Sequence, residues 1–147
     1  LLTNQTVVEF LSIPSWARRI TMLFDAVSSS GTSEWLIQLG DSGGFETTGY
    51  VSGGTRLSST TTATVTSTAG YILPSNVATN SLAGAVTVNH MTGNTWIAQG
   101  SVGGPTTMNL ITSGSKTTSA ALDRIRLTTG NGTDTFDAGT LNISYAP

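Results

Sequence analysis

Apolar and polar residues alternate with a period of two along most of this chain, and that pattern limits the folds it can adopt. In the segment 18–27, for example, Ile20, Met22, Phe24 and Ala26 occupy one set of alternate positions. Successive side chains of a strand point to opposite faces of a sheet. The segment therefore predicts a strand with Phe24 and its neighbours in a core and the other face in water.

About ten segments have strand patterns, and clusters of glycine, serine and asparagine separate them. The segments are Thr6–Leu11, Arg18–Val27, Glu34–Gly40, Phe45–Ser52, Ala63–Ser67, Ala85–Met91, Trp96–Ser101, Met108–Ser113, Arg124–Thr128 and Leu141–Tyr145. We predict a single all-β domain over residues 1–147, a jelly-roll-like antiparallel β-sandwich of about ten short strands. Within it, the Ser- and Thr-rich region Gly53–Gly70 is expected to be a long loop or an edge strand.

The composition narrows the possible partners and chemistry. Charged residues make up 10% of the 147 residues, well below the roughly 25% of an ordinary soluble domain. The net charge is −2 and there is no basic run, so we expect neither nucleic-acid binding nor attachment to an anionic membrane. No apolar run approaches the roughly 18 residues of a membrane-spanning helix, so we expect no membrane insertion. The chain has no cysteine, which excludes disulfides and thiolate chemistry, and we expect no cofactor.

One short stretch raises the question of catalysis, because Gly40-Asp41-Ser42-Gly43-Gly44 matches the residues around the nucleophile of trypsin-like proteases. Such a serine needs a histidine base and an aspartate that orients it. The only histidine, His90, follows Ser42 in the chain, contrary to the order in those enzymes. We interpret the stretch as a hairpin turn, in which Asp41 bonds to its own turn and glycine supplies positive φ. Replacing Ser42 with alanine should then leave function intact, whereas a bulky residue in place of Gly43 or Gly44 should disturb folding.

His90 and Trp96 are the candidate interface residues. His90 shares a strand face with Val86 and Val88, where a lone histidine is more often packed or interfacial than catalytic. Aromatic residues such as Trp96 ordinarily belong to the core. Trp96 has only Ala98 and Gly100 as neighbours on its face, so it is the first candidate for an exposed or interfacial aromatic side chain. Tyr145 and Phe24 fall on apolar faces and are expected to be buried.

Asp134 and Asp137 form a weak candidate for calcium binding, with Asn131 nearby in the sequence NGTDTFDAG. Calcium takes six to eight oxygen ligands, and the EF-hand spacing is absent here. The alternative is structural, with Asn131-Gly132 as a hairpin turn and Asp137 and Gly139 shaping a bend before the last strand. No other grouping predicts a metal site, and we identify no catalytic residue.

Both ends of the chain resemble a C-terminal β-sandwich module of tailed-phage and prophage virion proteins, often tail-fibre-like. The resemblance rests on Ile13-Pro14, Arg19-Ile20-Thr21, Ser30-Gly31-Thr32, Gln38-Leu39-Gly40-Asp41, the closing motif Asn131–Gly139, and Asn142-Ile143. Residues 53–116 are not covered by it. The resemblance implies a β-sandwich in a virion and carries no functional residue over to this chain. It also leads us to expect that the chain is a fragment or C-terminal part of a longer virion protein.

We therefore expect a non-enzymatic domain in the distal part of a tail fibre or spike, located in the extracellular phage particle and contributing to attachment to the host surface. Its partners would be other copies of itself, as a homotrimer, other virion proteins, and a glycan or receptor on the host. Two alternatives stay open. One is a decoration or cement protein of the capsid head, and the other is a carbohydrate-binding module or small glycan-active enzyme.

Overall fold

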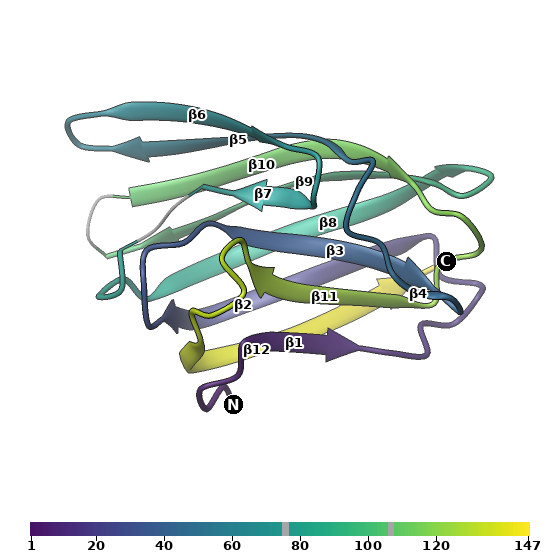
Figure 1. Ribbon diagram of the computed structural model, residues 1–147, viewed down its shortest axis with the longest axis horizontal. Helices are drawn as coiled ribbons and strands as arrows, with labels where there is room; N and C mark the ends of the chain where they lie inside the picture. Colours follow the sequence, from purple (N-terminus) through teal and green to yellow (C-terminus); the bar gives the residue numbers. More distant parts are fainter. Residues whose placement is uncertain (75–76, 106–107) are drawn as a thin grey trace.

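The computed structural model describes residues 1–74, 77–105 and 108–147, whose strands form two antiparallel sheets (Figure 1). The smaller sheet contains β1 (Val7–Phe10), β11 (Arg124–Thr129), β3 (Trp35–Asp41) and β4 (Gly44–Phe45) in that order, and β7 (Tyr71–Leu73) pairs with β3. The larger sheet contains β12 (Phe136–Ala146), β2 (Arg19–Ser29), β8 (Leu82–Thr92), β9 (Thr95–Gly104), β10 (Met108–Thr117), β5 (Val51–Ser58) and β6 (Thr62–Ser67) in that order. The predicted all-β sandwich is thus confirmed, with more strands than expected. Within the described residues, no helix is long and apolar enough to cross a membrane.

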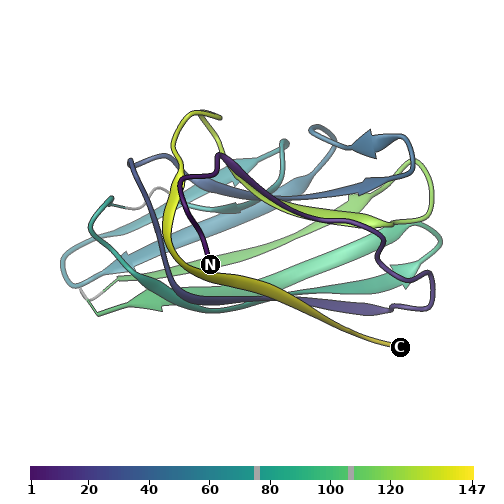
Figure 2. The ribbon, with the colours of Figure 1, turned by 90° about the horizontal axis from the view of Figure 1, so that it is seen from below.

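The two sheets lie one above the other and enclose a single apolar core (Figure 2). Trp35 of β3 is fully buried at its centre, stacked on Phe24 of β2 at 6.2 Å between ring centroids and edge-on to Phe136 of β12 at 5.4 Å. The Trp35 indole N–H donates to Ser29 Oγ over 3.1 Å, so the buried polar atom of this large side chain has a partner. Aromatic side chains from both sheets therefore join them, and Phe24 is buried as predicted.

Strand β2 departs from the expected alternation at Ala26. The pairing of β2 with β8 shifts between Phe24 and Val27, and Ala26 has a φ of 51°. This bulge adds one residue and reverses the alternation, so Val27 is fully buried and Ala26 is exposed. The sequence pattern placed Ala26 on the core face, which is wrong because alternation cannot show where a bulge interrupts it.

The predicted strand Phe45–Ser52 is two strands with an irregular segment between them. β4 ends at Phe45 and β5 begins at Val51. Tyr50 interrupts the strand because its ring turns into the core, where its hydroxyl accepts a hydrogen bond from the Leu39 N–H at 2.7 Å and donates to the Glu46 carbonyl at 3.0 Å. These bonds satisfy the hydrogen-bonding groups of the buried phenol. They also tie Tyr50, at the end of the loop, to β3 and to Glu46 at the start of the loop.

The region Gly53–Gly70 is mostly a hairpin, with β5 and β6 joined by a short turn at Ser58–Thr61. β6 forms one edge of the larger sheet, so the edge-strand alternative was correct. The hairpin lies at the margin of the molecule in Figure 1. Five of the six β6 residues are exposed.

Candidate functional site

Ser42 lies in a tight turn and is exposed to solvent. Asp41 pairs with Gly44 across the β3–β4 hairpin, and the Gly43 N–H donates to Asp41 Oδ1 over 2.8 Å. The predicted hairpin and its aspartate-bonded turn are both confirmed. His90 belongs to β8 in the other sheet, and a ring nitrogen of His90 bonds the Gly93 carbonyl at 2.8 Å. None of the contacts described for His90 reaches Ser42, so the geometry does not form a catalytic pair.

The carboxylates around this turn instead join the two sheets in a polar cluster of Asp41, Glu46, Lys116 and Ser119. Ser119 Oγ donates to Asp41 Oδ2 over 2.6 Å, and the Ala120 N–H donates to the same oxygen over 2.8 Å. Lys116 of β10 is 6% exposed and forms an ion pair with Glu46. Its ammonium also donates to the Thr48 carbonyl over 2.9 Å. The cluster is therefore a structural clamp that fixes the loop after β4 onto the larger sheet.

Hydrogen bonding lowers the pKa of both carboxyls in the polar cluster. The Ser119 hydroxyl and the Gly43 N–H lower the pKa of Asp41, because both stabilise the charged form. Burial alone would raise the pKa of Glu46, but the bond from Lys116 and the Ser119 N–H outweigh it, so the pKa is lowered. Both groups bind their protons less tightly in the folded chain than in the unfolded chain.

This difference predicts acid sensitivity. A carboxyl with a lowered folded-state pKa contributes stability above its unfolded pKa, and that contribution is lost as the pH falls through the folded value. We expect the thermal midpoint of unfolding to fall as the pH decreases from about 5 to about 3, across the ordinary carboxyl range. Differential scanning calorimetry of the protein and of D41N checks it. D41N should start lower at neutral pH and change less in acid, and equal slopes for the two proteins would contradict the prediction.

Trp96 is 4% exposed, so it belongs to the core and is not the exposed aromatic for which it was a candidate. Trp96 shares the buried inner face of β9 with Ala98. Gly100 has no side chain because a Cβ there would lie 2.3 Å from the Ala85 carbonyl oxygen of β8. The His90 ring lies edge-on to Trp96 with 5.0 Å between centroids, and both line a small pocket of about 60 Å³ together with Arg18. Trp96 Nε1 has no hydrogen-bond partner in the described residues. The two candidate residues thus come together, but in a space large enough only for solvent-sized molecules.

Asp134 and Asp137 bind separate parts of the chain. Asp134 Oδ2 accepts from the Ser33 N–H at 3.0 Å, whereas Asp137 accepts from the Ser28 hydroxyl. The Asn131 side chain and the Ser33 N–H lower the pKa of Asp134. In the described parts of the chain, no three histidine or acidic side chains gather as a metal site would require. No further acidic side chain of the described residues joins Asp134 and Asp137 as a possible calcium ligand, and both aspartates bind partners within the fold.

The turn at Asn131-Gly132 also differs from the expected hairpin. β11 and β12 belong to different sheets, so this turn carries the chain from one sheet to the other. Asn131 Oδ1 accepts from the Thr133 and Asp134 N–H groups, each over 3.0 Å, and Gly132 has a φ of +68°. The turn residues were identified correctly, but the sequence does not show to which sheet the following strand returns.

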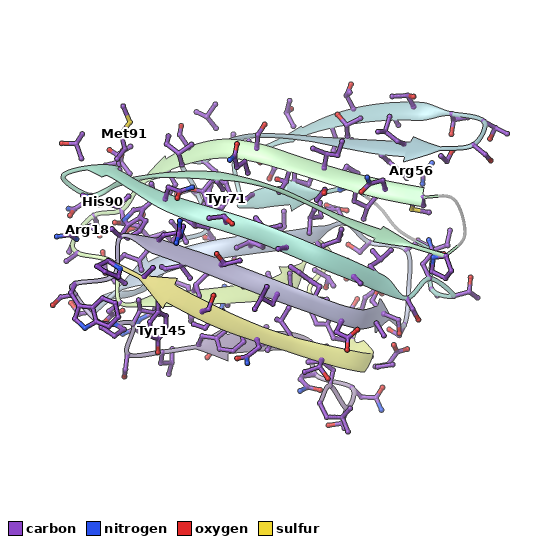
Figure 3. The ribbon with its side chains drawn as sticks, turned by 180° about the vertical axis from the view of Figure 1, so that it is seen from behind. Arg18, Arg56, Tyr71, His90, Met91 and Tyr145 are labelled. Atoms are coloured by element: carbon purple, nitrogen blue, oxygen red, sulfur yellow. The ribbon has the colours of Figure 1, made fainter. Side chains whose placement is uncertain are left out.

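The aromatic side chain predicted to be buried near the C-terminus is partly exposed. Tyr145 is 42% exposed and Trp16 is 53% exposed, and their rings meet edge-on with 5.9 Å between centroids. Tyr145 occupies a core-facing position opposite Ile20, but β12 is the last strand of the sheet and its C-terminal end is not fully covered. Figure 3 shows Tyr145 at this end of β12.

Two neighbouring hollows of the described surface lie on the outer face of the larger sheet, which faces the viewer in Figure 3. Thr21, Thr87, Gln99 and Ser113 lie directly opposite one another on β2, β8, β9 and β10. Two shallow hollows of about 400 and 510 Å³ share Thr87 and Gln99. We name this continuous surface, centred on the four-residue row, the sheet-face groove.

The sheet-face groove has little charge. Its first hollow presents mainly hydroxyl and amide groups, whereas Ala85 and the partly exposed Ile111 add apolar surface to the second. Asn89 and Ser144 line its first hollow, and Arg19 is the only charged residue among the described residues that line either hollow. Thr21 Oγ1 and Thr87 Oγ1 are 3.4 Å apart and share a weak hydrogen bond, which leaves most of the polar capacity of the row open to a ligand. Such a surface can bind a neutral, hydroxyl-rich molecule.

The sequence did not identify the groove residues as a site. Each occupies a polar position of an alternating strand, which indicates exposure and nothing more. Thr21 and Thr87 become neighbours only because β2 pairs with β8, and a gap of 66 residues separates them in the chain. Comparisons with protein-family models, curated proteins and solved structures found no match.

Proposed function

We propose that this chain is a non-enzymatic attachment domain of a phage virion, in the distal part of a tail fibre or spike, and that it binds neutral glycan of the host surface in the sheet-face groove. The observation that carries the proposal is the row of hydroxyl and amide side chains across four strands, in hollows whose described lining includes a single charged residue. Hydroxyl and amide groups match the donors and acceptors of uncharged sugars. The sequence resemblance to tail-fibre-like virion modules supports the setting.

The composition of the groove also favours binding over hydrolysis. Glycoside hydrolysis ordinarily uses two carboxyl groups that face each other across the sugar. No carboxylate is among the described residues that line the two hollows. Asp41, Glu46, Asp134 and Asp137 are all bound to structural partners elsewhere.

The groove is shallow, so a single copy should bind weakly and attachment should depend on several copies. A homotrimer at the end of a fibre would present three grooves to one cell surface. Linked sites raise the overall affinity through a high effective concentration without a tight individual site. Other virion proteins would hold the trimer in the particle.

The groove residues supply the test. We expect Q99A and T87A each to weaken binding to purified bacterial surface polysaccharides on a glycan array by about fivefold, because each removes roughly 1 kcal/mol of hydrogen bonding. Thr47 is exposed in the loop after β4, and T47A is the matched control that should bind as the original chain does. Binding that survives both groove substitutions, or no binding to any polysaccharide and no competition with phage adsorption, would overturn the proposal.

A further inference from the structure

One edge of the sandwich has none of the features that ordinarily protect an edge strand. At the opposite edge of the larger sheet, β12 is bulged twice in its first half. The N-terminal segment covers that half through the bonds from the Leu2 N–H to the Gly139 carbonyl and from the Asn4 N–H to the Phe136 carbonyl. In the smaller sheet, the edge strand β1 has only four residues and includes Glu9, and β4 and β7 have two and three residues. Short length, bulges, charge and covering segments are the ordinary means of preventing edge-to-edge pairing.

β6 has none of these features. Its six residues, Thr62–Ser67, contain no charge, proline or glycine, and its pairing with β5 runs without a register shift. Five of its six residues are exposed, and Ser67 is half-buried. Three of its residues are threonine and one is valine, which favour extended structure. This edge therefore presents an unpaired, regular and neutral strand.

We propose that β6 pairs antiparallel with β6 of a second copy of this chain, across a two-fold axis, to form a continuous intermolecular sheet. The second copy is the occupant that fits because the strand is complementary to itself. Without charge on β6, two copies bring no like charges together, and an isologous contact closes on itself. The pairing is independent of glycan binding and of any three-fold contact between copies.

The register of the hairpin identifies the backbone groups that would form the contact. The Ser58 N–H donates to the Thr61 carbonyl over 2.9 Å, which makes this a hydrogen-bonded pair of the hairpin. In an antiparallel ladder such pairs alternate, so Ala63 and Val65 bond to β5, whereas Thr62, Thr64 and Thr66 direct their N–H and C=O groups toward the open edge. A two-fold axis at Thr64 then places Thr64 opposite Thr64 of the second copy, and Thr62 opposite its Thr66.

The contact is small, so the association should depend on concentration. Stable protein interfaces usually bury about 1,200 Å² or more, which is beyond what two six-residue strands provide by backbone pairing alone. Apolar side chains add some area, since Leu57 of β5 and Val65 of β6 are each partly exposed. We expect a reversible equilibrium in which the assembly doubles in mass as the concentration rises.

Substitutions at Thr64 test the pairing in the full chain. T64K places two ammonium groups opposite each other at the axis, and T64P removes an N–H that points away from β5, a position where an edge strand tolerates proline. Thr140 is exposed on β12 at the opposite edge of the same sheet, so T140K is the matched control. Sedimentation velocity over a concentration series measures the mass, and circular dichroism checks that each variant is folded.

We expect the original chain and T140K to reach twice the mass of folded T64K and T64P at the highest concentrations. The proposal is overturned if the original chain has the mass of T64K at every concentration. It is equally overturned if both Thr64 variants keep the full mass of the original chain, because the association would then use another surface. Glycan binding by single copies should be unchanged in T64K, which separates this proposal from the proposed function.

Discussion

Replacing Lys116 with methionine is expected to lower the free energy of unfolding by about 2 kcal/mol, because it leaves the Glu46 carboxylate without its cation at the contact between the sheets. Methionine keeps most of the aliphatic volume, so the loss reports charge and hydrogen bonding rather than a cavity. The value lies below the 3–5 kcal/mol of fully buried pairs, since the Glu46 side chain retains 20% exposure. The Thr48 carbonyl and the Tyr50 ring, 5.2 Å from the ammonium, also lose their contacts.

A double-mutant cycle separates these contributions. The variant with K116M and E46Q should recover part of the lost stability, because no unpaired charge remains near the core. Urea unfolding of the original chain, the two single variants and the double variant gives the coupling free energy. Purely additive effects would show that Lys116 and Glu46 do not stabilise each other, contrary to the geometry.

The sequence predicted the local elements of the fold well and its long-range contacts poorly. Alternation located the strands around Ile20 and Ile125, and the turn chemistry of Asp41 was correct in its hydrogen bond. The sequence could not predict that Lys116 is buried. A lysine at an inward position of β10 is stable only where an acidic partner neutralises it, and that partner, Glu46, lies 70 residues earlier in the chain. That meeting depends on the packing of two sheets, which no local pattern records.

The motifs Ser30-Gly31-Thr32, Gln38–Asp41 and Asn131–Gly139 form contacts within the fold. Gly31 lies beneath the Asp134 carboxylate, where a Cβ would come within 2.3 Å of Asp134 Oδ2. The Ser30 N–H donates to the Thr135 carbonyl over 2.8 Å, so the turn after β2 and the closing motif hold each other. Gln38 likewise bonds the Ala69 carbonyl and Arg126. These residues specify how the sandwich closes, which is why they carried a prediction of fold and none of a binding site.

The groove shows the opposite case, in which the residues that matter for the proposed function carry no motif. Threonine and glutamine at outward strand positions occur throughout this chain, and Thr87 and Gln99 are not distinguished from the others by spacing. Their neighbours on β2 and β10 define them as a site. Sequence periodicity therefore predicted the exposure of these side chains, and only the strand order could predict their proximity.

Within Gly40-Asp41-Ser42-Gly43-Gly44, the first glycine is expected to be the most sensitive to substitution. We expect G40A to lower the free energy of unfolding by about 3 kcal/mol, at the upper end of the range for overpacking. A Cβ on Gly40 would lie 2.4 Å from the Gly44 carbonyl oxygen and 2.8 Å from Phe45 Cα, so the backbone of the hairpin would have to move. That movement would also break the pairing of Asp41 with Gly44 and weaken the polar cluster.

Substitutions at the other residues of this stretch should lower the free energy of unfolding less than G40A does, and they serve as controls. S42A should change stability by less than about 0.5 kcal/mol, as for an exposed residue outside special features. Gly44 has a φ of +124°, so a bulky residue there is strained even though the space around it is open, whereas Gly43 has only a close approach of 3.1 Å to Asp41 Oδ1. Urea unfolding should rank the loss as largest for G40A, intermediate for G44V and smallest for S42A. A stable G40A, or an S42A that abolishes glycan binding while staying folded, would contradict the assignment of this stretch to structure and return Ser42 to consideration as a functional residue.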